Sequence, residues 1–498
     1  MSHKISRRLF VASGLAALAA PAMADPPAMS LRPLLRPPGL GAGRAAAAVE
    51  ALIAEARLQG DVGYAVTDTE TGAVLEARAA DTALPPASVT KAVTALYALD
   101  TLGAGHRFKT RLVATGPVEG GVLRGDLVLA GGGDPTLDTD ALADMAAALK
   151  RAGVREVSGA FRVWGGAVPY RRAIEPRQPP HAGYNPALSG LSLNYNRVHF
   201  EWTRAGGDYT ITMDARSGRY RPDVTVARMR IADRRSPVYT YHDAGGRDDW
   251  TVARGALGGG GARWLPVRKP ELYAGEVFAT FARSQGIVLK APQVVEGAAP
   301  QGATLVTHES DPLADILRGM LRYSTNITAE MVGMAASARR RGRALDLAAS
   351  AREMTGWAQA TLGMKTTDLR DHSGLNDLSR LSALDMARAL AAAGRADALR
   401  PLLREFTMRD ARGRPLRNHP VEVQAKTGTL YFVSALAGYF TPPGGREMTF
   451  AVLTASDSLR GRIDPFRDTR PPGARGWNRR AKRLQQALIE RWSEIYGG

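Results

Sequence analysis

The 498-residue sequence contains no cysteine, which excludes disulfides, thiolate metal sites and a cysteine nucleophile. Its eight histidines are scattered along the chain, with no close pair. It also has neither an H-E-x-x-H nor a G-x-S-x-G motif. These absences argue against a zinc peptidase and against a hydrolase that uses a Ser-His-Asp triad.

Beyond its first residues the sequence has no apolar run long enough to span a membrane. A positively charged start precedes a short apolar segment at 9–20 and a small-residue pattern that ends at Ala24. The Arg7-Arg8 pair is similar to a twin-arginine export signal, and an ordinary secretory signal is the alternative. We therefore expect a signal peptide at 1–24, cleavage near Ala24 and a periplasmic protein.

The sequence is short of acidic residues, and its formal net charge is +18. In an exported protein this charge favours an anionic polymer such as peptidoglycan as the partner, and we expect no nucleic-acid binding. The arginines are spread out, as in the run 339–341, and each run alone is typical of a solvated face. The sequence leaves open whether the chain forms a homo-oligomer.

The composition changes three times along the mature chain. Residues 25–43 are rich in Pro and Ala and predict a flexible leader. Residues 108–295 contain short apolar runs separated by Gly, Asp and Pro, which indicates a β-rich region, predicted as two small subdomains. We expect one domain built from 44–107 and 296–498, and the β-rich region 108–295 inserted into it.

The two flanking parts predict helices and an antiparallel sheet. The hydrophobic spacing predicts helices at 45–58, after Ser88, and at 312–322, 326–340, 343–361 and 382–393, with strands at 62–76, 421–430, 434–440 and 448–454. The last apolar stripe, between Trp477 and Ile495, favours a terminal helix packed on the sheet; a basic amphipathic membrane anchor is the alternative.

Ser88 and Lys91 form the first chemical motif, S-x-x-K, at the start of a predicted helix. Positions i and i+3 share a helix face, so the hydroxyl and the amine can meet in one pocket. A serine nucleophile needs a neighbouring base, and a lysine is a base only if its pKa is lowered. The pattern alone is common by chance, and a capped helix with a surface lysine also explains it.

Two further motifs follow, and each alone is also explained by local structure. Ser324 and Asn326 form S-x-N before an apolar helix, where the hydroxyl can relay a proton and the amide can hold a substrate amide and orient Lys91. Lys426-Thr427-Gly428-Thr429 lies in a predicted strand. Lys426 and Thr427 can bind a carboxylate, and Gly428 leaves room for a substrate backbone. The N–H groups of Thr429 and Ser88 can form an oxyanion hole.

The three motifs in this order match those of β-lactamases and penicillin-binding proteins. Ser324 follows Ser88 by 236 residues (324 − 88), which is far more than a simple β-lactamase has. The segments 125–137, 188–196, 371–375 and 425–439 are also similar to family segments. The chain therefore resembles the class C low-molecular-mass penicillin-binding proteins, the D-Ala-D-Ala carboxypeptidase/endopeptidase family.

This resemblance implies an α/β (α+β) fold with a β-lactamase/transpeptidase-like domain, an antiparallel sheet flanked by helices, and a large β-rich insert between the first and second motifs. It implies a cofactor-free DD-carboxypeptidase and DD-endopeptidase that acts on peptidoglycan stem peptides and is acylated by β-lactams at Ser88. Lys91 is assigned as the base, with Ser324, Asn326 and Lys426 as its catalytic partners. The two lysines are expected to titrate together.

The alternatives are a β-lactamase, a transpeptidase, or a peptidoglycan-binding protein without catalysis. A fast β-lactamase usually needs a dedicated carboxylate for deacylation, and the sequence shows none. The chain departs from the family at 161–166, where no Asp or Glu supplies the acid that is thought to hold the free amino end of the stem peptide.

Overall fold

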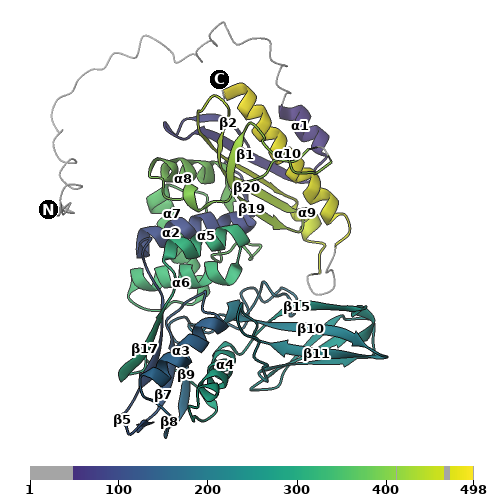
Figure 1. The fold of residues 1–498 in the computed structure, drawn as a ribbon. Coiled ribbons are helices and arrows are strands. Elements are labelled where there is room, and N and C mark those ends of the chain that lie inside the picture. Colours follow the sequence, from purple (N-terminus) through teal and green to yellow (C-terminus); the bar gives the residue numbers. More distant parts are fainter. Residues whose placement is uncertain (1–48, 411, 465–470, 497–498) are drawn as a thin grey trace, which may run out of the picture. The chain divides into compact units, whose positions relative to one another are not determined.

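The computed structural model describes residues 49–410, 412–464 and 471–496 (Figure 1). The predicted signal peptide and leader lie outside these residues. Within them, no helix combines the length and the apolar character needed to cross a membrane.

A five-stranded antiparallel sheet joins the two ends of the described chain. Its strand order is β19-β20-β21-β1-β2, so three C-terminal strands pair with an N-terminal hairpin. The strands are β1 (Asp61–Asp68), β2 (Val74–Arg78), β19 (Glu422–Leu430), β20 (Val433–Thr441) and β21 (Met448–Ala455). Strand β19 is an edge of this sheet. Residues 404–406 pair with its outer side from Val423 to Ala425, and beyond Ala425 no strand of the described chain pairs with that side.

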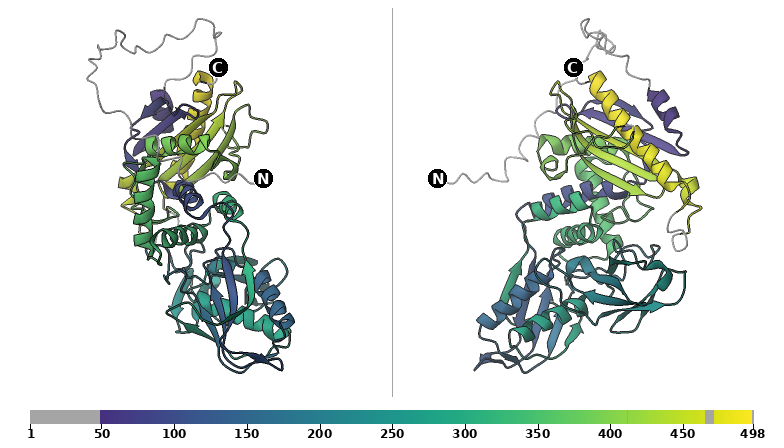
Figure 2. Two further views of the ribbon diagram at one scale, coloured as in Figure 1. Left: turned by 90° about the vertical axis from the view of Figure 1, so that its left-hand side faces the viewer. Right: turned by 45° about the vertical axis from the view of Figure 1, so that its right-hand side comes forward.

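Both faces of the sheet are covered, as the alternation of side chains in β21 shows. Ala451 and Leu453 face the cluster that includes α8 (Ala383–Arg395), while Phe450 and Val452 face α10 (Ala474–Tyr496). Figure 2 shows α8 and α10 on opposite sides of the strands. Helix α1 (Val49–Ala56) packs beside α10. The stripe from Trp477 onward therefore packs on the sheet, as the favoured sequence interpretation predicted.

A group of helices lies next to this sheet and is built around α2 (Thr90–Leu102). All nine residues from Thr90 to Ala98 are buried, because α5 (Leu313–Tyr323), α6 (Asn326–Arg341) and α7 (Leu347–Leu362) pack around them. Tyr97 packs against Trp357 of α7, with ring centroids 5.1 Å apart and the rings tilted by 51°. A helix buried on all sides holds the residues at its N-terminus in fixed positions.

The inserted region contains a five-stranded sheet in the order β16-β9-β7-β4-β17. Its strands are β4 (Lys109–Ala114), β7 (Leu127–Gly131), β9 (Phe161–Trp164), β16 (Pro292–Val295) and β17 (Ala303–Glu309). Because β17 pairs with β4, the β-rich region extends beyond the predicted boundary at 295 to Glu309.

The same region also contains two helices that the β-rich composition did not predict, α3 (Thr139–Arg151) and α4 (Pro270–Ser284). Asp138 caps α3 by accepting the Ala141 N–H at 2.8 Å, and alanine-rich residues continue it. Pro270 stands in the first turn of α4, where proline favours a helix start.

Three three-stranded sheets complete the insert, one of them made of the short strands β5, β6 and β8, and the teal part of Figure 1 shows the sheet of β10, β11 and β15. The first contains β10 (Arg197–Ala205), β11 (Asp208–Asp214) and β15 (Gly260–Pro266), and the second β12 (Ala227–Ala232), β13 (Tyr239–Asp243) and β14 (Asp248–Ala253). Shorter elements are β3 (Ala83–Leu84), β18 (Leu381–Ser382), β5 (Val118–Glu119), β6 (Val122–Leu123), β8 (Glu156–Val157) and α9 (Asp457–Arg460).

Candidate active site

Ser88 lies in a tight 3-10 turn, Ala87–Val89, directly before α2. Ala87 adopts a left-handed backbone conformation with φ +45°, which is unfavourable for a residue with a Cβ. Two glycines from distant segments pack against this turn. A Cβ on Gly374 would lie 1.8 Å from Ala87 O, and one on Gly428 would lie 3.1 Å from Ser88 N. The turn that presents Ser88 is therefore held by close backbone packing.

Lys91 is completely buried, and its amine makes three hydrogen bonds. Nζ donates to Ser88 Oγ at 3.0 Å, to Asn326 Oδ1 at 2.8 Å and to the Ser373 carbonyl at 2.8 Å. Burial lowers the pKa of Lys91 below its usual range, although nearby carboxylates oppose the shift. The amine is thus in contact with the serine hydroxyl, and a larger fraction of it is neutral at neutral pH than for a solvated lysine.

Ser324 and Asn326 stand at the junction of α5 and α6. Ser324 ends α5 with φ +58°, and Asn326 is the first residue of α6. Both side chains therefore lie at the sharp bend between the two helices. Asn326 Nδ2 donates to the carbonyl of Tyr184 at 3.0 Å, and this residue belongs to the insert. Asn326 thereby links Lys91, through its Oδ1, to the insert, through its Nδ2.

Lys426, the first residue of the third motif, lies on the edge strand β19, and its side chain reaches the bend at Ser324. Its Nζ donates to Ser324 Oγ at 3.1 Å and to the Thr427 carbonyl at 2.7 Å. Burial, the positive charge of Lys91 and that of Arg404 lower the pKa of Lys426 well below its usual range.

The structure therefore brings the predicted residues into one site. Ser88, Lys91 and Asn326 are joined by hydrogen bonds, as are Ser324 and Lys426. Gly428 lies against the Ser88 turn, Thr427 is half-buried, and Thr429 is exposed at the end of the strand. The oxyanion-hole assignment of the Thr429 and Ser88 amides stays a prediction.

The close approach of Gly428 to the Ser88 turn gives a testable expectation. A Cβ there would lie 2.7 Å from Pro86 O, a backbone atom, so Gly428→Ala requires β19 or the turn to move. We expect acylation of Ser88 by a labelled penicillin to slow about tenfold, because small misplacements of reacting groups are costly. Gly259→Ala is the matched control, since nothing lies within 4 Å of its Cβ position. Equal rates for Gly428→Ala and wild type would contradict the expectation.

Two buried carboxylates near Lys91 were missed by sequence reasoning. Glu330 is completely buried on α6, and Asp371 is buried in the segment that precedes β18. Both interact electrostatically with Lys91. A sequence signal for Glu330 was present, because it follows Asn326 by four residues and so shares its helix face. Asp371 lay in a family-like segment, without an assigned role.

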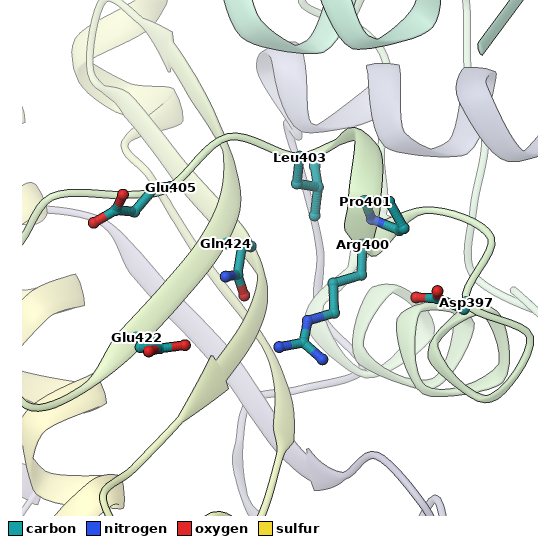
Figure 3. Close-up of a pocket in the computed structure, with 7 residues that line it drawn as sticks. All are labelled: Asp397, Arg400, Pro401, Leu403, Glu405, Glu422 and Gln424. Atoms are coloured by element: carbon teal, nitrogen blue, oxygen red, sulfur yellow. The ribbon is translucent and has the colours of Figure 1, made fainter.

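A separate cavity of about 630 Å³ lies near the opposite end of β19 from Gly428 and contains none of the motif residues (Figure 3). It is lined by Asp397, Arg400, Pro401, Leu403, Glu405, Glu422 and Gln424. Arg400, whose side chain extends into this space in Figure 3, is ion-paired with Glu447. The cavity is therefore distinct from the hydrogen-bonded site at Ser88.

Among the described residues, one group has the composition and spacing of a metal site, His199, Glu201 and Asp214 in the insert. Arg216 Nη2 donates to Glu201 at 2.6 Å and to Asp214 at 3.0 Å. The arginine already supplies the positive charge that these carboxylates need, so the cluster is explained as an ion-pair network.

Comparisons with known proteins agree with this geometry. The chain matches the D-Ala-D-Ala carboxypeptidase 3 (S13) family over residues 45–465. A D-alanyl-D-alanine carboxypeptidase of an Actinomadura species is 29% identical over 451 residues, which cover 82% of this chain and 80% of that protein. The corresponding Haemophilus influenzae enzyme is 23% identical over 418 residues, which cover 78% of this chain and 84% of that protein.

The fold also has solved counterparts. Penicillin-binding protein 4 from Haemophilus influenzae has a TM-score of 0.74 at 20% identity, covering 91% of this chain and 100% of that chain. The same protein in complex with a novel β-lactam has a TM-score of 0.69. These similarities show the fold, and they confirm the predicted mixed α+β architecture.

A buried lysine in contact with a serine at a helix start, beside the edge strand of an antiparallel sheet, defines the penicillin-binding class of serine peptidases. The family match covers most of the sequence, and the chain belongs to the D-Ala-D-Ala carboxypeptidase 3 (S13) family. It is a serine-type DD-carboxypeptidase, and the predicted family and enzyme class are both confirmed.

Proposed function

We propose that the enzyme cleaves peptidyl-D-Ala-D-Ala stems of peptidoglycan through an acyl-enzyme on Ser88, with Lys91 as the base. The observation that carries this proposal is the 3.0 Å hydrogen bond between Lys91 Nζ and Ser88 Oγ inside a buried site. The export signal predicted at 1–24 and the basic character of the chain favour a periplasmic enzyme that acts on an anionic polymer.

The first chemical step is acylation. Lys91 in its neutral form takes the Ser88 proton, and Ser88 Oγ attacks the carbonyl carbon of the penultimate D-alanine. Backbone N–H groups of Ser88 and Thr429 stabilise the oxyanion that forms. Asn326, already bound to Lys91, orients the amine and accepts the stem peptide beside it.

The second step releases the terminal D-alanine. Ser324 passes a proton to the leaving nitrogen, and it is replenished from Lys426 Nζ at 3.1 Å. The C–N bond breaks, D-alanine departs with a neutral amine, and an ester to Ser88 remains. Lys426 and Thr427 bind the terminal carboxylate of the substrate until this point.

Hydrolysis of the ester completes the cycle. Water attacks the acyl carbon, the C–O bond to Ser88 breaks, and one proton of the water restores the serine hydroxyl. Lys91 releases the proton that it took from Ser88, and Lys426 takes up one proton from solvent, so both amines return to their starting states. The same reaction on a D-alanyl bond within a cross-bridge gives the endopeptidase activity. β-Lactams acylate Ser88 by ring opening, without a departing fragment.

Product analysis tests the proposal. Purified enzyme is incubated with intact cross-linked peptidoglycan, and mass spectrometry identifies free D-alanine and separated cross-bridges. We expect both products from the wild type. A wild type that cleaves neither pentapeptide nor cross-bridge would contradict the catalytic proposal and favour a non-catalytic binding protein.

The lifetime of a penicillin adduct separates this proposal from a β-lactamase. Among the described residues, no carboxylate is hydrogen-bonded to Ser88, and the buried Glu330 and Asp371 carboxylates accept backbone N–H groups instead. We therefore expect a long-lived adduct on Ser88. Rapid turnover of penicillin would indicate a β-lactamase.

A further inference from the structure

The carbonyl that binds Lys91 belongs to a segment held in place by Glu330. Glu330 Oε2 accepts the N–H of His372 at 2.8 Å, and Oε1 accepts the N–H of Ser373 at 3.0 Å. The carbonyl of the same Ser373 accepts the Lys91 amine at 2.8 Å. One buried carboxylate thus fixes two successive peptide groups directly before the carbonyl that orients Lys91.

Asp371 holds the other side of this carbonyl. Its Oδ1 accepts the N–H of Gly374 at 2.7 Å, and its Oδ2 accepts that of Asn376 at 2.6 Å. The Gly374 N–H belongs to the same peptide group as the Ser373 carbonyl, so this bond strengthens the carbonyl as an acceptor. Together the two carboxylates bind four backbone N–H groups of the segment.

The charges around Lys91 come from three different elements. Glu330 on α6 and Asp371 in the loop raise the pKa of Lys91, and burial lowers it by a larger amount. Lys426 on β19 is the like charge nearby, and its own pKa is lowered by burial first and then by the charge of Lys91. The buried His372 ring faces Ser350 and Met354, and burial lowers its pKa to about 3, so it contributes no charge at neutral pH.

The hydrogen bonds define the resting state of this group. Lys91 donates to three acceptors, which uses every N–H of an ammonium group. Both oxygens of Glu330 accept N–H groups, as expected of a carboxylate, although burial and the neighbouring Asp371 carboxylate raise the pKa of Glu330 to about 8. Lys91 must therefore lose a proton before it can accept the one from Ser88, and Glu330 opposes that loss.

We propose that Glu330 is a positioning residue that holds the Ser373 carbonyl against Lys91 and sets the pH at which Lys91 becomes a base. The inference rests on the proposed function, because it concerns acylation of Ser88. Glu330 is hydrogen-bonded to the His372 and Ser373 N–H groups and not to Ser88, and it acts through Lys91.

The pH profile of acylation tests this role. The second-order rate of labelling by a fluorescent penicillin is measured between pH 5 and about 10, where lysine-linked titration is expected. Glu330→Gln removes a charge that raises the pKa of Lys91, so this pKa falls and the neutral amine forms at lower pH. We expect the acidic limb of the profile to move to lower pH by about one unit. An acidic limb that coincides with that of wild type overturns the proposal.

Two further variants keep the test decisive. Glu330→Asp retains the charge but shortens the side chain, so we expect an unmoved limb and a plateau about tenfold lower. If Glu330→Gln does not fold in a thermal unfolding experiment, a Glu330→Asp plateau equal to wild type overturns the proposal. Glu353→Gln is the control, because Glu353 is a largely buried carboxylate of α7 whose ion pairs are with Arg340 and Arg341. Its limb is expected at the wild-type pH.

The outcomes separate the two proposals. If penicillin does not label the wild type at Ser88, the proposed function fails, and the role of Glu330 falls with it. If the wild type is labelled and the Glu330→Gln limb is unmoved, the proposed function stands and only the role of Glu330 is rejected.

Discussion

Ser88→Ala is expected to abolish D-alanine release and penicillin labelling together, with a rate loss of about 10⁴-fold or more. The hydroxyl is the atom that becomes acylated in both reactions, and its hydrogen bond is to Lys91. The chain has no cysteine to take its place, and the hydroxyl of the second motif, Ser324, is bonded to Lys426. The loss is measured as free D-alanine from a pentapeptide and as a covalent adduct on a denaturing gel.

The same variant is expected to remain folded. Ser88 is half-buried, and its loss leaves Lys91 with two of its three acceptors, Asn326 and Ser373. Thermal unfolding should therefore change little, since one hydrogen bond contributes about 1 kcal/mol. Ser458→Ala, which removes an exposed hydroxyl on α9, is the control. Penicillin labelling that persists in a folded Ser88→Ala protein would place the nucleophile elsewhere.

Lys91→Met is expected to slow acylation about 10³-fold while Ser88 stays in place. Methionine has a similar length and fills the buried position, but it cannot accept the serine proton. General bases contribute about 10² to 10⁴ in rate, and this range sets the expected loss. Acylation by the wild type should also fall as the pH drops, because Lys91 becomes protonated below its pKa of about 8. The acylation rate of the Lys91→Met variant should not show this fall with decreasing pH.

The replacement also removes a buried positive charge from the neighbourhood of two carboxylates. Glu330 and Asp371 then lose the cation that lowers their pKa values, so both are expected to bind protons more readily. Thermal unfolding of the variant at several pH values measures the resulting loss of stability. A folded Lys91→Met protein that is acylated within tenfold of the wild-type rate would exclude Lys91 as the base.

The local parts of the site could be predicted because they depend on near neighbours in the chain. Ser88 and Lys91 are three residues apart at a helix start, and Lys426 to Thr429 lie in one strand. Apolar spacing also predicted the helices around α2 and the strands of the C-terminal sheet. The helices α3 and α4 were not predicted, since the short apolar runs bounded by Gly, Asp and Pro around them are typical of strands.

The remaining contacts join residues that are remote in the sequence. Asn326 lies 235 residues from Lys91 and Ser373 lies 282 residues from it, yet both accept hydrogen bonds from the Lys91 amine. Which carboxylates are buried depends on how α6 packs against α2 and on the course of the loop at 371–376. Sequence spacing contains no information about those distances.

The sequence by itself determined the three motifs, their order and the size of the insert between them. These features follow from residue identity and local periodicity, and they sufficed to indicate the family. Only the tertiary structure decided that the Lys91 amine contacts Ser88 Oγ, Asn326 Oδ1 and the Ser373 carbonyl, with Glu330 behind that carbonyl. The physical reason is that burial and long-range packing set the protonation of a buried amine, and neither property belongs to any single segment of the chain.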